Sequence, residues 1–63
     1  LEAVKIPDGL DFRSVRGLRK EAQEKLDKIR PLSIGQASRI SGISPCDASL
    51  LYLYVEALRE RKS

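Results

Sequence analysis

The fold is decided by the segment Ser33–Pro45, SIGQASRISGISP. Ser33 and Gln36 have the spacing of a capping box, in which the serine accepts a hydrogen bond from the Gln36 amide and the glutamine reaches back. This pattern predicts a short helix over 34–41. Gly42 ends it, as glycine commonly does just past the end of a helix. The residues before this segment lead into it, and those after it form one apolar helix.

A longer helix over 45–59 follows the turn. Ser44 caps it, Pro45 occupies the first helical position, where a missing N–H costs nothing, and Asp47 suits the positive end of the helix dipole. Its apolar residues cover most of the helix circumference, which is more than one core-facing stripe. Some of this surface should therefore meet another domain or chain. The candidate partner contacts are Leu50, Leu53, Tyr54, Ala57 and Leu58.

A third helix is predicted upstream, over 18–30. Its apolar residues recur at helical spacing on one narrow stripe, and Pro31 ends the helix because the residue before a proline disfavours helical geometry. The predicted core stripe consists of Leu18, Ala22, Leu26 and Ile29. The other faces of this helix carry charged side chains.

The predicted architecture is all-α: a small three-helix domain over 18–63 with an extended N-terminal lead-in over 1–17. Asp8-Gly9 after a proline is a turn signal within the lead-in. The lead-in is expected to be anchored by three apolar residues, Ile6, Leu10 and Phe12. A bend or a single helical turn is expected over 12–17.

The chain of 63 residues is sufficient for one domain, and it has one cysteine and no histidine. Histidine is the commonest general acid–base catalyst, and no residues have metal-ligand spacing, so the sequence predicts neither catalysis nor a metal site. Cys46 lies where a helix dipole can lower a thiol pKa, which allows a reactive cysteine, but no partner base is evident. We therefore expect Cys46 to be a small, partly buried filler.

No apolar run reaches the roughly 20 residues that span a bilayer, and no signal-peptide pattern is present. These features predict no membrane association. A single free cysteine fits a reducing cytosol better than a secreted scaffold, so a cytoplasmic location is expected. The chain starts at Leu1 rather than methionine, which suggests a piece of a longer protein.

The formal net charge is +3, and basic residues are concentrated between 13 and 30. Such a surface suits a phosphate-bearing partner, although a solvated helix face of mixed charge explains it equally well. The candidate RNA contacts are Arg19, Lys20, Lys28, Arg30, Gln36 and Arg39. For Arg39, a local salt bridge or a capping role is the alternative. Gly35 leaves two interpretations, a backbone approach to phosphate or close packing of another helix.

The segment 36–51 partly imitates a DNA-binding helix-turn-helix. A recognition helix should carry polar and basic residues near its start to contact base edges. Here the second helix starts with Pro45, Cys46 and Asp47, and an aspartate facing phosphates is unfavourable. A free-standing DNA-binding module therefore remains an alternative, and a purely structural cap on a larger enzyme is a third.

Residues 34–45 also resemble a signature near the C-terminus of the glucose-inhibited division protein A family. These are FAD-dependent enzymes that install the 5-carboxymethylaminomethyl group on the wobble uridine of certain tRNAs. Further similarity covers nearly the whole chain, through Ile6-Pro7, Asp11-Phe12, Gly17-Leu18 and 24–31.

The resemblance implies a non-catalytic C-terminal helical domain of a much longer enzyme, whose FAD- and NADH-binding parts lie earlier in the chain. It also implies docking of a partner GTPase and contact with tRNA. Two departures concern the helices. Arg19 stands where the family commonly has a capping serine, and Cys46 stands where a small residue such as alanine is usual. Tyr52 and Tyr54 also depart from the family pattern, on a helix face where the partner is expected to bind.

Overall fold

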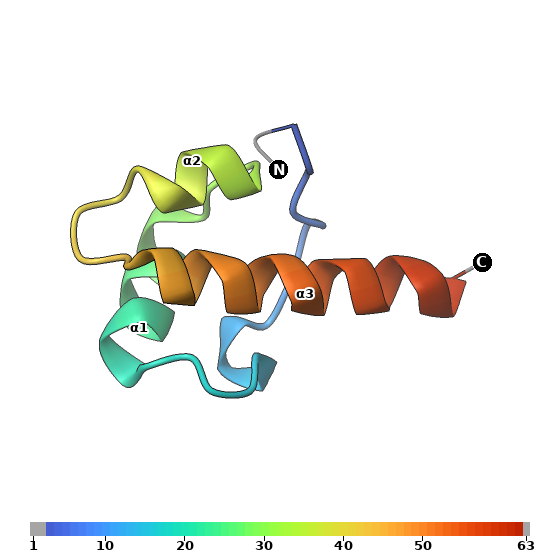
Figure 1. The fold of residues 1–63 in the computed structure, drawn as a ribbon, viewed down its shortest axis with the longest axis horizontal. Coiled ribbons are helices and arrows are strands. Elements are labelled where there is room, and N and C mark those ends of the chain that lie inside the picture. Colours follow the sequence, from blue (N-terminus) through green and yellow to red (C-terminus); the bar gives the residue numbers. More distant parts are fainter. Residues whose placement is uncertain (1–2, 63) are drawn as a thin grey trace.

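A computed structural model of the chain describes residues 3–62, with the backbone alone at position 62. The first two residues of the predicted lead-in and the last residue of the helical domain lie outside this range. The described part of the chain is helical and contains no strand, which confirms the all-α prediction (Figure 1). Its elements are a 3₁₀ helix η1 (Phe12–Ser14) and the α-helices α1 (Lys20–Ile29), α2 (Ile34–Ser38) and α3 (Pro45–Lys62).

The N-terminal segment is extended and is hydrogen-bonded to the linker between α1 and α2. The Ile6 amide donates to the Leu32 carbonyl at 2.9 Å, and the Ile34 amide donates to the Val4 carbonyl at 2.9 Å. From there the segment passes behind α3 to reach η1 (Figure 1). The three predicted anchors of the lead-in, Ile6, Leu10 and Phe12, are all buried.

Helix α1 begins two residues later than predicted. The backbone of Arg19 is extended (ψ 148°), and its side chain makes no capping hydrogen bond, so helical geometry starts only at Lys20. The helix ends at Ile29, and the following residue, Arg30, adopts the left-handed conformation (φ 54°). The predicted core position of Ile29 is wrong, since this residue is 53% exposed while Ala22 and Leu26 are fully buried. Ile29 is the last residue of α1, and the left-handed residue after it turns the chain toward Pro31.

Helix α2 ends at Ser38 instead of extending to 41, because the chain tightens into 3₁₀-type turns there. The Arg39 amide donates to the Gln36 carbonyl at 3.2 Å, and the Ile40 amide donates to the Ala37 carbonyl at 3.2 Å. Gly42 then adopts a φ of 96°, which L side chains rarely adopt.

The predicted capping residues at both helix starts are confirmed. Ser33 Oγ accepts from the Gln36 amide at 3.1 Å. The Gln36 side chain reaches back one residue further than in a standard capping box, and its Oε1 accepts from the Leu32 amide at 2.7 Å. At α3, Ser44 Oγ accepts from the Asp47 amide at 3.1 Å. Because these side chains accept hydrogen bonds from N–H groups that would otherwise be unpaired, residues next to each helix start determine where the helix begins.

Helix α3 runs to Lys62, three residues beyond the prediction, and spans the length of the molecule (Figure 1). Its inner face packs on the other elements through Leu51 and Val55, which are fully buried with Leu26. The apolar core draws on the lead-in, all three α-helices and the turns between them. Its members are Ile6, Leu10, Phe12, Val15, Leu18, Ala22, Leu26, Ile34, Ala37, Ile43, Leu51 and Val55.

The expected burial of Cys46 is wrong. Its thiol is free and exposed on the first turn of α3. This follows from the helical period, because the buried residue Asp47 is adjacent in sequence and thus about 100° away around the helix. The packing role proposed for Cys46 is therefore absent.

Candidate functional site

A polar corner joins the start of α1 to the start of α3. Asp47 is 2% exposed, and its carboxylate accepts from Arg19, whose Nη2 lies 2.7 Å from Oδ2. The same Arg19 nitrogen donates to the Gly42 carbonyl at 2.8 Å. The Ser44 amide donates to Asp47 Oδ2 at 3.0 Å, which completes the cap of α3. We call Arg19, Gly42, Ser44 and Asp47 the polar corner.

The hydrogen bonds of the polar corner stabilise the ionised carboxylate. The bond from Arg19 lowers the pKa of Asp47, and the two bonds with Ser44 lower it further, whereas burial opposes the shift. Conversely, the hydrogen bond to Asp47 and the charge of that carboxylate raise the pKa of Arg19. The acidic residue that argued against nucleic-acid contact is therefore an internal partner for a basic residue.

Two other predicted RNA contacts also have internal partners. Arg30 Nη1 donates to the Leu10 carbonyl at 2.9 Å, and its guanidinium carbon lies 5.3 Å from the centre of the Phe12 ring. Its other nitrogens bind the backbone and the side chain of Asp27. Gln36 uses its carbonyl oxygen to cap α2. Arg19, Arg30 and Gln36 thus hold elements of the domain together, and their predicted RNA contacts remain untested.

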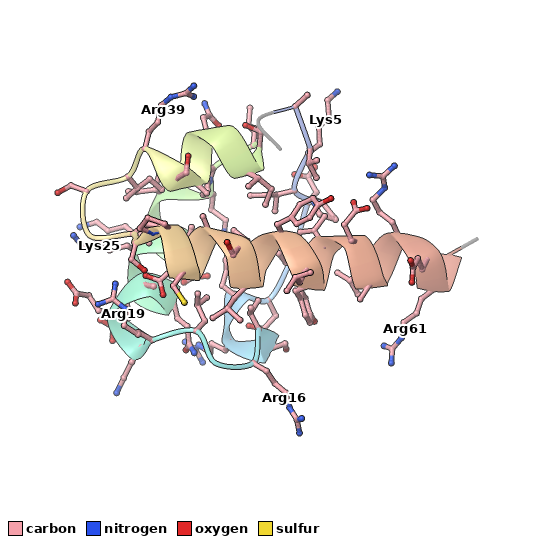
Figure 2. All side chains as sticks on the ribbon, in the orientation of Figure 1. Lys5, Arg16, Arg19, Lys25, Arg39 and Arg61 are labelled. Atoms are coloured by element: carbon pink, nitrogen blue, oxygen red, sulfur yellow. The ribbon has the colours of Figure 1, made fainter. Side chains whose placement is uncertain are left out.

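The remaining predicted RNA contacts, Lys20, Lys28 and Arg39, are exposed. Lys20 and Lys28 lie eight positions apart on α1, about 80° apart around the helix axis. Arg39 follows the end of α2, and its side chain points outward (Figure 2). Other labelled cations, including Lys5, Arg16 and Arg61, project to different sides of the molecule (Figure 2). The structure therefore spreads its basic side chains instead of gathering them into one patch.

The predicted partner contacts form one face of α3, because they follow the spacing i, i+3, i+4, i+7 and i+8. We call Leu50, Leu53, Tyr54, Ala57 and Leu58 the α3 strip. Leu53 at its centre is 62% exposed. Leu50, Tyr54 and Leu58 are half-buried and pack on the edge of the core. The strip is an apolar surface that the described residues cover only along one side.

An apolar groove of about 390 Å³ lies between α2 and α3. Gly35 is buried and forms part of the groove wall. The lining residues are Ile34, Gly35, Ser38, Ile43, Pro45, Ala48, Ser49 and Tyr52. The exposed positions at the start of α3, Pro45, Cys46 and Ser49, include none of the arginine, lysine, asparagine or glutamine side chains that commonly read bases.

Two features escaped the sequence analysis. The ion pair of Arg19 with Asp47 joins residues 28 positions apart, and no local pattern connects them. The second is an exposed aliphatic cluster around the α1–α2 linker, where Leu32 is 68% exposed. The sequence offers one signal for the cluster. Pro31 ends the helix just after Ile29, so no further helical turn follows the last residue of the predicted core stripe.

Neither metal binding nor a membrane span is supported by the part of the chain described. Between positions 3 and 62, no cluster of three or more His, Cys, Asp or Glu residues could hold a metal ion. Over the same range, no helix has the length and hydropathy needed to cross a bilayer.

A small helical bundle with an apolar helix face is the class of protein that this geometry defines. The chain belongs to the family described as the tRNA modifying enzyme MnmG/GidA C-terminal helical bundle, whose model matches residues 1–63.

Relatives and a solved structure agree with this assignment. The tRNA uridine 5-carboxymethylaminomethyl modification enzyme MnmG of Lachnoclostridium phytofermentans is 55% identical over 98% of this chain. The enzyme of the same name from Alkaliphilus oremlandii is 53% identical over the same share. The crystal structure of Aquifex aeolicus GidA (form II) superposes with a TM-score of 0.84 at 49% identity, covering 87% of this chain and 9% of that one. The chain spans about 10% of the length of these two relatives.

Proposed function

We propose that this domain is a docking and tRNA-contact module of a wobble-uridine modification enzyme. The α3 strip would bind the partner GTPase of the same pathway, and the basic side chains would contact tRNA. The observation that carries the proposal is the exposure of Leu53 (62%) at the centre of an apolar helix face. An exposed apolar face of this kind marks a contact with another apolar surface.

The proposed tRNA contact depends mainly on Lys20, Lys28 and Arg39. These three side chains are exposed. Arg19, Arg30 and Gln36 hold elements of the domain together. Dispersed cations suit a long phosphate backbone, which an enzyme can contact at several separate points. We therefore expect the domain to add affinity and orientation for tRNA, and the modification chemistry to lie elsewhere in the enzyme.

The FAD and NADH implied by the family resemblance do not fit these residues. A dinucleotide site needs a parallel sheet and a glycine-rich strand-to-helix turn. The regular elements of residues 3–62 are helices and one isolated bridge, Lys5 with Ser33. The flavin chemistry, the cytoplasmic location and the wobble uridine as substrate remain proposals for the full-length protein.

The GTPase contact is tested by calorimetric titration of the full-length protein with its partner GTPase at near-physiological salt. Leu53→Asp should abolish binding, because it places a charge at the centre of the apolar face. Ser49→Asp is the matched control, since it adds the same charge at another exposed position on the same helix and should bind normally. Binding by Leu53→Asp equal to that of the unmodified protein would contradict this role of the strip.

The tRNA contact is tested by comparing tRNA with duplex DNA at matched salt. Arg39→Glu should weaken tRNA binding and leave the helical circular dichroism unchanged. Loss of that signal would instead assign Arg39 a structural role. Preference for duplex DNA would support the helix-turn-helix alternative. Equal binding of tRNA by the variant and the unmodified protein would contradict the proposed contact, and no GTPase or nucleic-acid effect in any variant would favour the structural cap.

A further inference from the structure

An exposed aliphatic cluster surrounds the linker between α1 and α2. We call Ile29, Leu32 and Ile40 the linker patch. Leu32 is 68% exposed, Ile29 is 53% exposed, and Ile40 is partly buried against the core. The three side chains line one hollow of about 230 Å³, together with Arg30, Pro31 and Gln36. Contiguous aliphatic surface of this kind marks a contact with another apolar surface.

Neither of the polar residues near the patch makes it a nucleic-acid site. Arg30 is bound to Leu10, Asp27 and the Phe12 ring, and the oxygen of Gln36 caps α2. The patch also has no aromatic ring on which a base could stack. An apolar protein surface is therefore the partner chemistry that suits it.

The N-terminal segment runs directly beside this patch. Val4 and Ile6 are hydrogen-bonded to the backbone at Ile34 and Leu32, on either side of the bridge at Ser33. Leu32 also lines a second hollow, whose other walls are formed by residues 3 and 5–8 and by Ser33. Because the bridge is antiparallel, Ala3 lies toward Ile34 and the start of α2, and it shares the hollow just described with Leu32.

Comparison with relatives indicates how much chain lies upstream. The matched segment is 10% of the length of the Lachnoclostridium enzyme, and the family model is described as a C-terminal bundle. We infer that the linker patch, and not the α3 strip, docks onto an apolar surface of the preceding part of the same polypeptide. The patch then orients the domain and leaves the α3 strip accessible. This inference concerns a different surface from the proposed GTPase contact and does not depend on it.

The test compares the labelling of two engineered cysteines in the full-length family protein that carries this segment, without its partner. Leu32→Cys and Leu53→Cys are well matched, because the two leucines are 68% and 62% exposed in the domain. Both are made in a Cys46→Ser background, since Cys46 is itself exposed. A soluble maleimide is the probe, peptide mapping by mass spectrometry measures each site, and each rate is divided by the rate in denaturing urea.

We expect Leu32→Cys to react about tenfold more slowly than Leu53→Cys, which corresponds to an opening free energy of ~1.4 kcal/mol. Leu32→Ser should leave the secondary structure intact but increase proteolysis of the upstream junction. Equal normalised rates at the two positions, fast or slow, would overturn the assignment. Protection of Leu32→Cys that disappears on dilution would also overturn it, since a second copy would then be covering the patch.

Discussion

Helix α3 contributes to two contrasting regions: the polar corner buries a charged side chain, whereas the α3 strip exposes an apolar one. At the start of α3, the carboxylate of Asp47 is 2% exposed and fully paired. Further along, Leu53 is 62% exposed. The corner satisfies its groups within the domain, so substitutions there should affect folding. The strip leaves apolar surface exposed to solvent, so substitutions there should affect association and leave folding intact.

The sharpest test of this contrast uses two leucines two residues apart in α3. Leu51 is fully buried, and Leu51→Ala should lower the free energy of unfolding by about 3 kcal/mol through lost transfer energy and a residual cavity. Leu53→Ala should change it by less than about 0.5 kcal/mol. Urea denaturation followed by circular dichroism measures both values. Similar losses for the two variants would show that the strip is part of the fold.

The next largest effect is expected at the polar corner. Asp47→Asn should lower the free energy of unfolding by about 2 kcal/mol at pH 7, because it removes a charged hydrogen-bond acceptor shared by Arg19 and Ser44. Asp8→Asn, at an exposed turn position, is the control and should stay within about 0.5 kcal/mol.

The same variant should change the pH dependence of stability. Since the pKa of Asp47 is lowered in the folded state, its contribution is complete above the unfolded pKa of about 3.9. It is lost as the pH falls from there through the lower folded pKa. The difference between the unmodified protein and Asp47→Asn should thus shrink in acid. A difference that stays constant from pH 7 to pH 2 would contradict this linkage.

A smaller effect is expected at the second polar junction, where Arg30 holds a left-handed conformation (φ 54°). Arg30→Ala and Arg30→Gly both remove the bonds to Leu10 and Asp27, but only glycine adopts this conformation without steric cost. The glycine variant should therefore be more stable than the alanine variant by about 1 kcal/mol, measured by thermal denaturation. Equal stability would indicate that the alanine variant shifts its backbone out of the left-handed region.

The smallest effect is expected at Cys46, which lies beside the polar corner in sequence and yet outside the core. Cys46→Ser should change the free energy of unfolding by less than about 0.5 kcal/mol, because the side chain is exposed. The unmodified native domain should also react completely with a soluble thiol reagent. A slow reaction that needs unfolding would restore the buried filler that the sequence suggested.

Most of the local structure could be predicted from the sequence, because its determinants lie within a few residues of one another. Ser33, Gly42, Ser44 and Pro45 each act on the backbone next to them, and they set the starts of α2 and α3 and the turn between them. The boundaries were less accurate where a tertiary contact competes. Arg19 leaves the first turn of α1 without a side-chain cap because a guanidinium has no hydrogen-bond acceptor, and it donates to Asp47 and Gly42 on the far side of the turn.

The candidate surfaces were predicted in part. The α3 strip followed from excess apolar residues on one helix, which is a property of composition and period. The linker patch could not be predicted in this way. An apolar residue at helical spacing predicts a core position, and the sequence pattern is the same whether or not another element covers that residue. Ile29 is the case in point, a residue in register with Leu26 that is 53% exposed.

By itself, the sequence determined the all-α class, the capped starts of α2 and α3, and the surplus of apolar surface on the last helix. These depend on hydrogen bonds and periodicities over three or four residues, which are visible along the chain. Only the tertiary structure decided which cations are available and which apolar residues stay uncovered. Both outcomes depend on pairs such as Arg19 with Asp47, and Ile6 with Leu32, whose separation in sequence carries no information about their contact.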